Sequence, residues 1–163
     1  MRSVIAVYVE NKYGVLTRVS GLFMRKGFNI NSLTVGETDD PAYSRITITL
    51  NGDDYAREQL INQLKKLYNV KGVKLLEADS SVERELMLIK VRNTPETRGE
   101  VLAAADIYRA NIIDYTTEAM CIEVTGETSK IKAFIDVLKP LGIIEMCRTG
   151  VVALQRGGSI MEK

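Results

Sequence analysis

Several residues near the start of the chain have the chemistry of a small-molecule site, and they lie in the stretch "ENKYGVLTRVSGLFMRKGFNIN". Asn11 and Asn29 carry amides that both donate and accept hydrogen bonds, which suits a zwitterion with an ammonium and a carboxylate group. Gly14 stands where an amphipathic helix is predicted to begin, so the backbone N–H groups of Gly14, Val15 and Leu16 lack intrahelical partners there. Such groups bind a carboxylate or a phosphate, and the missing Cβ allows close approach.

A purely structural interpretation of the same stretch stays open. Gly14 can simply cap the helix or adopt a positive φ, and each asparagine can be a turn residue. Taken alone, the stretch favours this interpretation, because single glycines at helix starts are common. Neither GxGxxG nor GxxxxGK[ST] occurs, so a nucleotide site is not supported.

Residues for catalysis are scarce. The chain contains no histidine, which removes most hydrolase triads and most zinc sites. An enzyme interpretation would look to Glu37, Asp39 and Asp40 as a metal or acid–base site. A solvated hairpin turn ending at Pro41 is favoured, because no second cluster of metal ligands accompanies these residues. We therefore expect no catalytic residue and no metal site in this chain.

The composition limits the possible partners and the compartment. The 163 residues suffice for one ordinary domain or two small ones, and the formal charge of +1 provides no global attraction to nucleic acid or anionic lipid. No apolar run approaches the ~20 residues needed to cross a bilayer, and "MRSVIAVYVE" is too short an apolar stretch for a signal peptide. We expect a cytoplasmic protein that binds neither membrane nor nucleic acid.

The two cysteines, Cys121 and Cys147, form no CxxC pair and lie among apolar residues. This favours two reduced core cysteines over a disulfide or a redox pair.

One pattern occurs twice along the chain, and this repeat changes how Gly14 is interpreted. A shift of 82 residues aligns Asn11 with Asn93 and Asn29 with Asn111, and after residue 34 a shift of 74 takes over because the second copy lacks eight residues. Gly14 is then matched by Glu96, whose carboxylate would repel an anion. If the copies differ in function, the first is the one expected to bind a ligand.

The predicted order of strands (β) and helices (α) in each copy is βαββαβ. In the first, strands are predicted over residues 4–9, 30–35, 45–50 and 70–76, with one helix ended by Gly27 and a second capped by Asp53 or Asp54. In the second, strands are predicted over residues 85–91, 112–115 and 120–125. One helix there starts at Thr94-Pro95, another is stopped by Pro140, and a last strand, "IIEMCRTGVVALQ", is broken at Gly150.

This order predicts an α+β protein with two tandem ferredoxin-like βαββαβ domains. The first domain covers residues 1–77, a polar linker covers 78–83 and the second domain covers 84–163. Because the first strand carries apolar residues on both sides, we expect the sheet face away from the helices to be covered by another copy of the sheet, from the same or another chain. Oligomerisation is therefore expected.

The residues resemble a known family. The ACT domain is a βαββαβ module that binds small ligands, usually amino acids, at the loop between its first strand and first helix. More closely, "VENKYGVLTRVSGLFMRKGFNINSLTVGETDDPAYSRITI" is similar to the N-terminal ACT domain of the regulatory (small) subunits of acetohydroxyacid synthase, also called acetolactate synthase. "VERELMLIKV", "IIDYTTEA" and "RTGVVALQRG" resemble the C-terminal domain of that family, so the resemblance covers nearly the whole chain.

The resemblance implies a chain without chemistry of its own. Members of the family associate with a catalytic subunit that uses thiamine diphosphate, magnesium and FAD on the pathway to valine, leucine and isoleucine. They raise its activity and confer feedback inhibition by valine. The resemblance places valine between the ACT domains of a homodimer, in contact with Asn11, Gly14, Val15 and Leu16 of one chain and with Asn29 and Ile30 of the facing chain.

The alternative function is a stand-alone ACT-type amino-acid sensor that regulates another enzyme. An ACT-type transcriptional regulator is disfavoured, because no segment before or between the copies is long enough for a helix-turn-helix domain. The preferred branched-chain amino acid is left open, because one methylene in an apolar pocket changes affinity by only ~1–3 kcal/mol.

Overall fold

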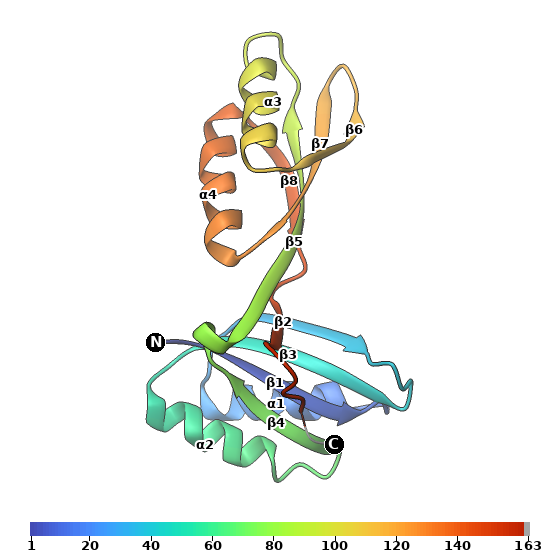
Figure 1. Ribbon diagram of the computed structural model, residues 1–163, viewed down its shortest axis with the longest axis vertical. Coiled ribbons are helices and arrows are strands. Elements are labelled where there is room, and N and C mark those ends of the chain that lie inside the picture. The colour runs from blue at the N-terminus through green and yellow to red at the C-terminus, as the bar shows by residue number, and fades with distance from the viewer. Residues whose placement is uncertain (162–163) are drawn as a thin grey trace. The chain divides into compact units, whose positions relative to one another are not determined.

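The computed structural model describes residues 1–161 and contains two compact units, each built on the βαββαβ order predicted from the repeat (Figure 1). The first copy contains β1 (Arg2–Glu10), α1 (Val15–Lys26), β2 (Ile30–Glu37), β3 (Tyr43–Asn51), α2 (Asp54–Leu64) and β4 (Val70–Leu76). After the short helix η1 (Ala78–Ser80), the second contains β5 (Ser81–Arg92), α3 (Arg98–Ile107), β6 (Asn111–Tyr115), β7 (Ala119–Gly126), α4 (Thr128–Leu138), η2 (Lys139–Leu141), β8 (Ile143–Arg148) and β9 (Val152–Gln155).

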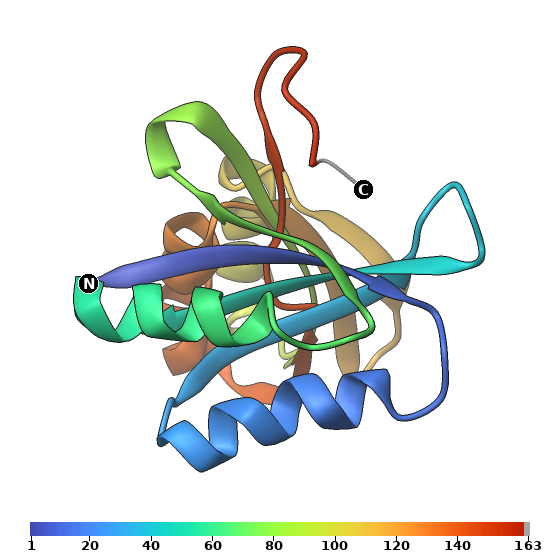
Figure 2. The same cartoon turned by 90° about the horizontal axis from the view of Figure 1, so that it is seen from below.

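The two sheets have the same strand order, which confirms the predicted pair of ferredoxin-like folds. The first runs β2-β3-β1-β4 and the second β6-β7-β5-β8, with antiparallel pairing throughout these paths. In the first unit, Figures 1 and 2 show α1 and α2 on one face of the sheet. Alternate residues of β1 point to these helices, where Ile5 and Val7 pack against Phe23 and Leu60 in one core. An equivalent core holds Met87, Ile89, Val101 and Phe134 in the second unit.

Local signals placed most helix ends correctly. α1 stops before Gly27, as predicted. Gly27 has a φ of 70°, and its backbone N–H donates a hydrogen bond to the Met24 carbonyl, which closes the helix. Asp53 caps α2, accepting a hydrogen bond from the Ala56 amide at 2.7 Å. The predicted start of α3 at Pro95 is wrong, because Thr94 closes a separate turn through its hydroxyl and the helix begins only at Arg98.

The domain boundaries differ from those expected. The first unit takes in the expected linker, which forms η1 and the start of β5, and the second unit spans Arg84–Gly150. The chain breaks at Gly150, with φ 81°, as predicted, but from Val151 on it belongs to the first unit rather than to the second. Residues 151–161 are called the C-terminal segment below. Cys147 is exposed on β8, so its expected place in the core is also wrong, whereas Cys121 is half-buried.

The C-terminal segment covers the sheet face of the first unit that the helices leave open. Val151 and Ala153 pack against Val4, Ala6 and Leu76 in a small second core. The segment is also bound by the sheet, since the Val151 amide donates to Ser32 Oγ at 3.3 Å and Arg45 Nη2 donates to the Ala153 carbonyl at 2.8 Å. The expected cover, another copy of the sheet, is therefore replaced at these residues by the chain's own end. Small side chains on this face leave room for a strand to approach closely.

Among the described residues, no helix combines the length and the apolar character that crossing a membrane requires.

Two adjacent valines test whether this segment stabilises the first unit. Val151 is 2% exposed and Val152 is 47% exposed. We expect Val151→Ala to lower the unfolding free energy of the first unit by about 1–2 kcal/mol, because two buried carbon groups are lost. Val152→Ala, the same change on the same segment, should cost less than about 0.5 kcal/mol. The measurement is native-state hydrogen exchange at the amides of β1, and equal effects of the two changes would contradict the proposed packing role.

Candidate functional site

A polar network around Glu10 holds the turn between β1 and α1 in place. Its carboxylate accepts hydrogen bonds from Asn69 Nδ2 at 2.8 Å and forms ion pairs with Lys71 at 2.9 Å and Lys12 at 3.0 Å. Asn69 in turn accepts from Arg18 of α1 at 2.7 Å, so the network joins the end of β1, the first helix and the start of β4. The bonds from Lys71, and after it from Lys12 and Asn69, hold the pKa of Glu10 down at about 2. The sequence analysis missed this network, since nothing in the local pattern marks residues far apart in the chain as partners.

Asn11 is placed by this turn, but its amide nitrogen is already engaged. Nδ2 donates to Glu37 Oε1 and to the Pro41 carbonyl, both at 3.0 Å, while the backbone amide donates to the Ala42 carbonyl at 2.8 Å. The side chain therefore ties the end of β1 to the hairpin between β2 and β3. Within residues 1–161 no donor contacts Asn11 Oδ1, which stays available to accept from a ligand.

Gly14 has the backbone conformation that a side chain would disfavour. Its φ of 80° and ψ of −6° lie in the left-handed region, so the structural interpretation of this glycine is correct as far as it goes. A Cβ built there meets nothing within 4 Å, so the space above the turn is open. In the part of the chain that the structure describes, no side chain caps the start of α1.

The first turn of α1 offers unpaired donors. In the described part of the chain no acceptor is found for the amides of Gly14, Leu16 and Thr17, while the Val15 amide makes only a long bond of 3.4 Å to the Lys12 carbonyl. No acidic residue lies in this turn to compete for an anion. The Val15 side chain is buried in the core, so Val15 can contribute only its backbone, whereas Leu16 is 43% exposed. This arrangement can bind a carboxylate at the positive end of the helix.

Asn29 and Ile30 are not brought to this turn by the same chain. They follow α1, whose 12 residues separate its two ends by about 18 Å. Asn29 is exposed there, and Ile30 packs partly on the core at the start of β2, an edge strand of its sheet. One chain thus assembles Asn11, Gly14, Val15 and Leu16, and only a second chain could add Asn29 and Ile30.

The second copy provides an internal comparison for each of these features. Asn93 repeats the role of Asn11, because its backbone amide donates to the Glu118 carbonyl at 2.9 Å and its Nδ2 to the Thr116 carbonyl at 2.6 Å. Its Oδ1, however, accepts from Arg98 Nε at 2.7 Å. The Thr94 hydroxyl also accepts from the Thr97 amide just before the helix. The asparagine is therefore structural in both copies, and of the two only Asn11 keeps its side-chain oxygen open within residues 1–161. At the start of α3 the amides of Thr97 and Arg98 have acceptors, while those of Gly99 and Glu100 have none in the described part of the chain.

The acidic loop is a turn, as the favoured interpretation has it. Asp40 Oδ1 accepts from the Ala42 amide at 3.0 Å, and the Thr38 hydroxyl donates to the Asp40 carbonyl at 2.9 Å. Glu37 is held by Asn11. Across the described residues, no three His, Cys, Asp or Glu side chains are grouped so that they could hold a metal ion.

Comparison with known proteins identifies both halves of the chain. Residues 5–72 match the family described as the AHAS small subunit-like ACT domain, and residues 84–157 match the small subunit of acetolactate synthase. A probable acetolactate synthase small subunit from Archaeoglobus fulgidus is 52% identical over 158 residues, which cover 96% of this chain and 98% of the relative. The acetolactate synthase small subunit of Mycolicibacterium smegmatis is 48% identical, with 94% and 90% covered.

A solved structure agrees with these sequence matches. The small subunit of acetolactate synthase from Thermotoga maritima has a TM-score of 0.90 and 41% identity, with 98% of this chain and 99% of that chain covered. The match extends over both βαββαβ copies and over the C-terminal segment. The chain belongs to the family of acetolactate synthase small subunits.

Proposed function

We propose that this chain is the non-catalytic regulatory subunit of an acetohydroxyacid synthase in the cytoplasmic synthesis of branched-chain amino acids. It activates a catalytic subunit and makes that subunit sensitive to feedback inhibition by L-valine. Thiamine diphosphate, magnesium and FAD belong to the catalytic partner, and this chain binds the effector alone. The family membership supports the partnership, since a small subunit implies a larger one.

The open first turn of α1 is the observation that carries the effector site. The free amides of Gly14, Leu16 and Thr17 can receive the carboxylate of an amino acid, and Asn11 Oδ1 can accept from its ammonium group. The half-exposed Leu16 can contact a branched side chain. In the second copy Arg98 occupies the asparagine oxygen, and Thr94 accepts from the amides of Thr97 and Arg98, which supports one effector site per chain, in the first unit.

A homodimer completes the site in this proposal. The 12 residues of α1 place its two ends about 18 Å apart, so in this proposal a facing chain supplies Asn29 and Ile30. The edge strand β2 and its exposed Val35 give the first unit a surface on which a second copy can pair. An effector that touches both chains binds one arrangement of the dimer better than another, and this difference is the coupling free energy that regulation requires.

The effect of a negative charge at residue 14 can be tested separately from the effect of a side chain on the backbone there. Asp and Asn have nearly the same size and both tolerate the left-handed region better than other side chains, and a Cβ at this position meets no neighbour. We expect Gly14→Asp to weaken L-valine binding at least tenfold relative to Gly14→Asn, because only aspartate repels the carboxylate. Calorimetric titration measures both affinities, and circular dichroism checks the fold. Equal affinities of the two variants would refute the placement of the carboxylate.

Mixed dimers test whether two chains share one site. Homodimers of Gly14→Asp and homodimers of Asn29→Ala should each bind L-valine poorly. When the two variants are mixed, a heterodimer combines both changes in one site and leaves the other site with native Gly14 and Asn29. We expect calorimetry to recover one binding event of native affinity per heterodimer. Absence of any recovery in a sample shown by mass spectrometry to contain heterodimers would contradict the shared site.

Reconstitution tests the function itself. We expect the purified chain to show no acetohydroxyacid synthesis alone, to raise the rate of the catalytic subunit from the same organism, and to make that rate sensitive to L-valine. Gly14→Asp should keep the activation and lose the valine sensitivity, because the changed residue lies at the effector site. A chain that binds valine and leaves the catalytic subunit's rate unchanged would favour the alternative function, a stand-alone amino-acid sensor.

A further inference from the structure

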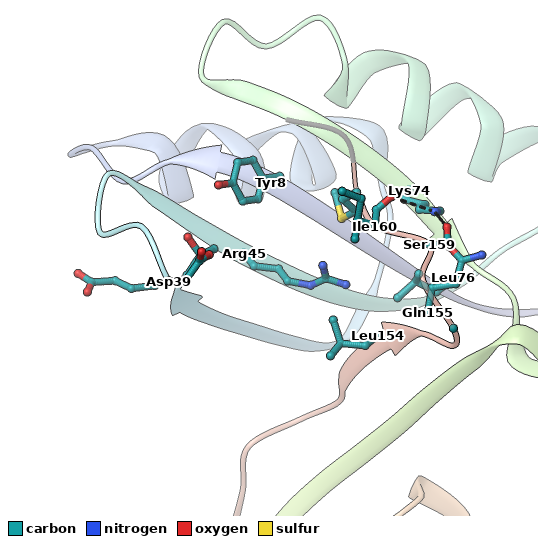
Figure 3. Close-up of a pocket in the computed structure, with 13 residues that line it drawn as sticks. Tyr8, Asp39, Arg45, Lys74, Leu76, Leu154, Gln155, Ser159 and Ile160 are labelled. Carbon is teal, nitrogen blue, oxygen red and sulfur yellow. Dashed lines mark hydrogen bonds between the residues drawn. The ribbon is translucent and has the colours of Figure 1, made fainter.

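A pocket lies on the sheet face of the first unit that the helices do not cover. It has a volume of 540 Å³ and lies between the sheet and the C-terminal segment, with Tyr8 of β1, Arg45 of β3 and Lys74 of β4 in its lining (Figure 3). Tyr8 pairs with Arg45 across one strand boundary, and Ala6 pairs with Lys74 across the other. The two cations therefore flank β1, with strand axes about 10 Å apart, and their long side chains reach the same space.

Among residues 1–161, neither cation has a carboxylate partner. Arg45 donates from Nη2 to the Ala153 carbonyl at 2.8 Å, and Lys74 donates from Nζ to Ser159 Oγ at 3.0 Å and to the Ile160 carbonyl at 3.4 Å. Over residues 1–161, no acidic side chain forms an ion pair with either cation. Partial burial lowers the pKa of Arg45 from its usual value, which reflects a guanidinium removed from water without an anion. Both cations are held in place by neutral groups and keep donors for a further acceptor.

The acidic residues of the pocket do not neutralise the end at which Lys74 and Ser159 lie. Glu37 and Asp39 also line it, but Glu37 accepts from Asn11, and the exposed Asp39 lies at the opposite end from Lys74 and Ser159 (Figure 3). A neighbouring hollow of 480 Å³ shares Lys74 and residues 159–161 with the pocket, and none of the described residues that line it is acidic. Lys74 therefore faces no acidic side chain of the described residues in this hollow either.

The pocket also has an apolar part. It consists of Leu76 of β4 and of Leu154, Ile160 and Met161 of the C-terminal segment, and Leu154 and Ile160 keep 61% and 77% of their surface exposed. Inorganic anions gain nothing from such a wall, whereas an organic acid with a short hydrocarbon part buries apolar surface against it. Cations beside exposed leucine and isoleucine thus indicate a ligand with one acidic group and one apolar part.

We propose that this pocket binds a small organic carboxylate, with the acid group on Arg45 and Lys74 and the hydrocarbon part against Leu154 and Ile160. The site is distinct from the effector site at α1, because α1 packs on the other face of the sheet. Its ligand contacts both the sheet and the C-terminal segment and so stabilises the segment in its place.

Titrations followed by nuclear magnetic resonance can test the ligand class. Hexanoate is the probe, hexanol is its uncharged counterpart and inorganic phosphate is an anion without an apolar part. We expect hexanoate to shift the Arg45 side-chain Nε–H signal and the backbone amides of Ala153 and Ser159 saturably, and both comparison compounds to bind at least tenfold more weakly. Hexanol that binds as well as hexanoate would overturn the role of the charge. Phosphate that binds as well would overturn the organic ligand, and absence of saturation would overturn the site.

Matched variants test the residues. Arg45→Gln and Lys74→Gln should each weaken hexanoate binding about tenfold or more, since each removes one charge-assisted contact. Lys66→Gln removes the same charge from an exposed lysine outside both hollows and should leave binding unchanged. Arg45 also holds the Ala153 carbonyl, and Lys74 also holds Ser159 and Ile160, so the backbone amide signals of Val151 and Ala153 without hexanoate check that each variant keeps the C-terminal segment in place. Equal binding by Lys74→Gln and Lys66→Gln would contradict the proposal.

Discussion

Strand β1 is buried on both of its faces, and the architecture of the first unit depends on that requirement. Residues 3–9 are all buried, although two helices on a four-stranded sheet cover only one face of that sheet. The helices bury Ile5, Val7 and Val9, and the other face needs a separate cover for Val4 and Ala6. The chain supplies that cover from residues more than 140 positions away. The proposed effector site lies just past the end of this strand, and the pocket of Arg45 and Lys74 lies on the face that the C-terminal segment covers.

The two copies differ at the residues of the proposed effector site. Both copies use the side-chain nitrogen of an asparagine after the first strand to hold the following hairpin, so this bond belongs to the fold. What differs is how the helix after it begins. In the first copy a left-handed glycine precedes the helix, and Oδ1 of its asparagine has no donor among residues 1–161. In the second, the Thr94 hydroxyl accepts from the Thr97 amide, and Arg98 donates to the asparagine oxygen. The proposed effector site therefore depends on polar groups that the first copy leaves without partners, since a satisfied group has nothing to offer a ligand.

Much of this could be predicted from the sequence, because the signals were local or repeated. Alternation and helical periodicity identified the strands and helices, and Gly27 and Asp53 ended or began helices through backbone geometry that one residue determines. Gly14 was recognised as special only by its mismatch with Glu96 in the other copy. The structure refines that inference, because positive φ alone already requires a glycine-like residue, and the open donors around it are the evidence for a ligand.

The parts that sequence reasoning missed depend on partners distant in the chain. No pattern near Val151 indicates whether the strand after Gly150 continues its own sheet or crosses to the other unit, because its alternation is the same in both cases. The network of Glu10 with Asn69 and Arg18 is invisible for the same reason. Small or polar residues on the open face, such as Ala6, Thr47 and Thr49, were the available hint, since they leave space above a sheet that large apolar residues would have filled.

The position of the C-terminal segment also bears on how regulation can work. Residues 84–150 form a unit of their own, and the chain enters and leaves that unit through β5 and the C-terminal segment, both of which begin or end on the first unit. Any ligand that changes how firmly the segment is held on the first sheet therefore acts on one of the two covalent connections to the second unit. An effector at α1 and an anion at Arg45 and Lys74 would act on opposite faces of the same sheet. Their effects are coupled only if the sheet or the dimer has two arrangements that each ligand distinguishes, and in that case the coupling is reciprocal.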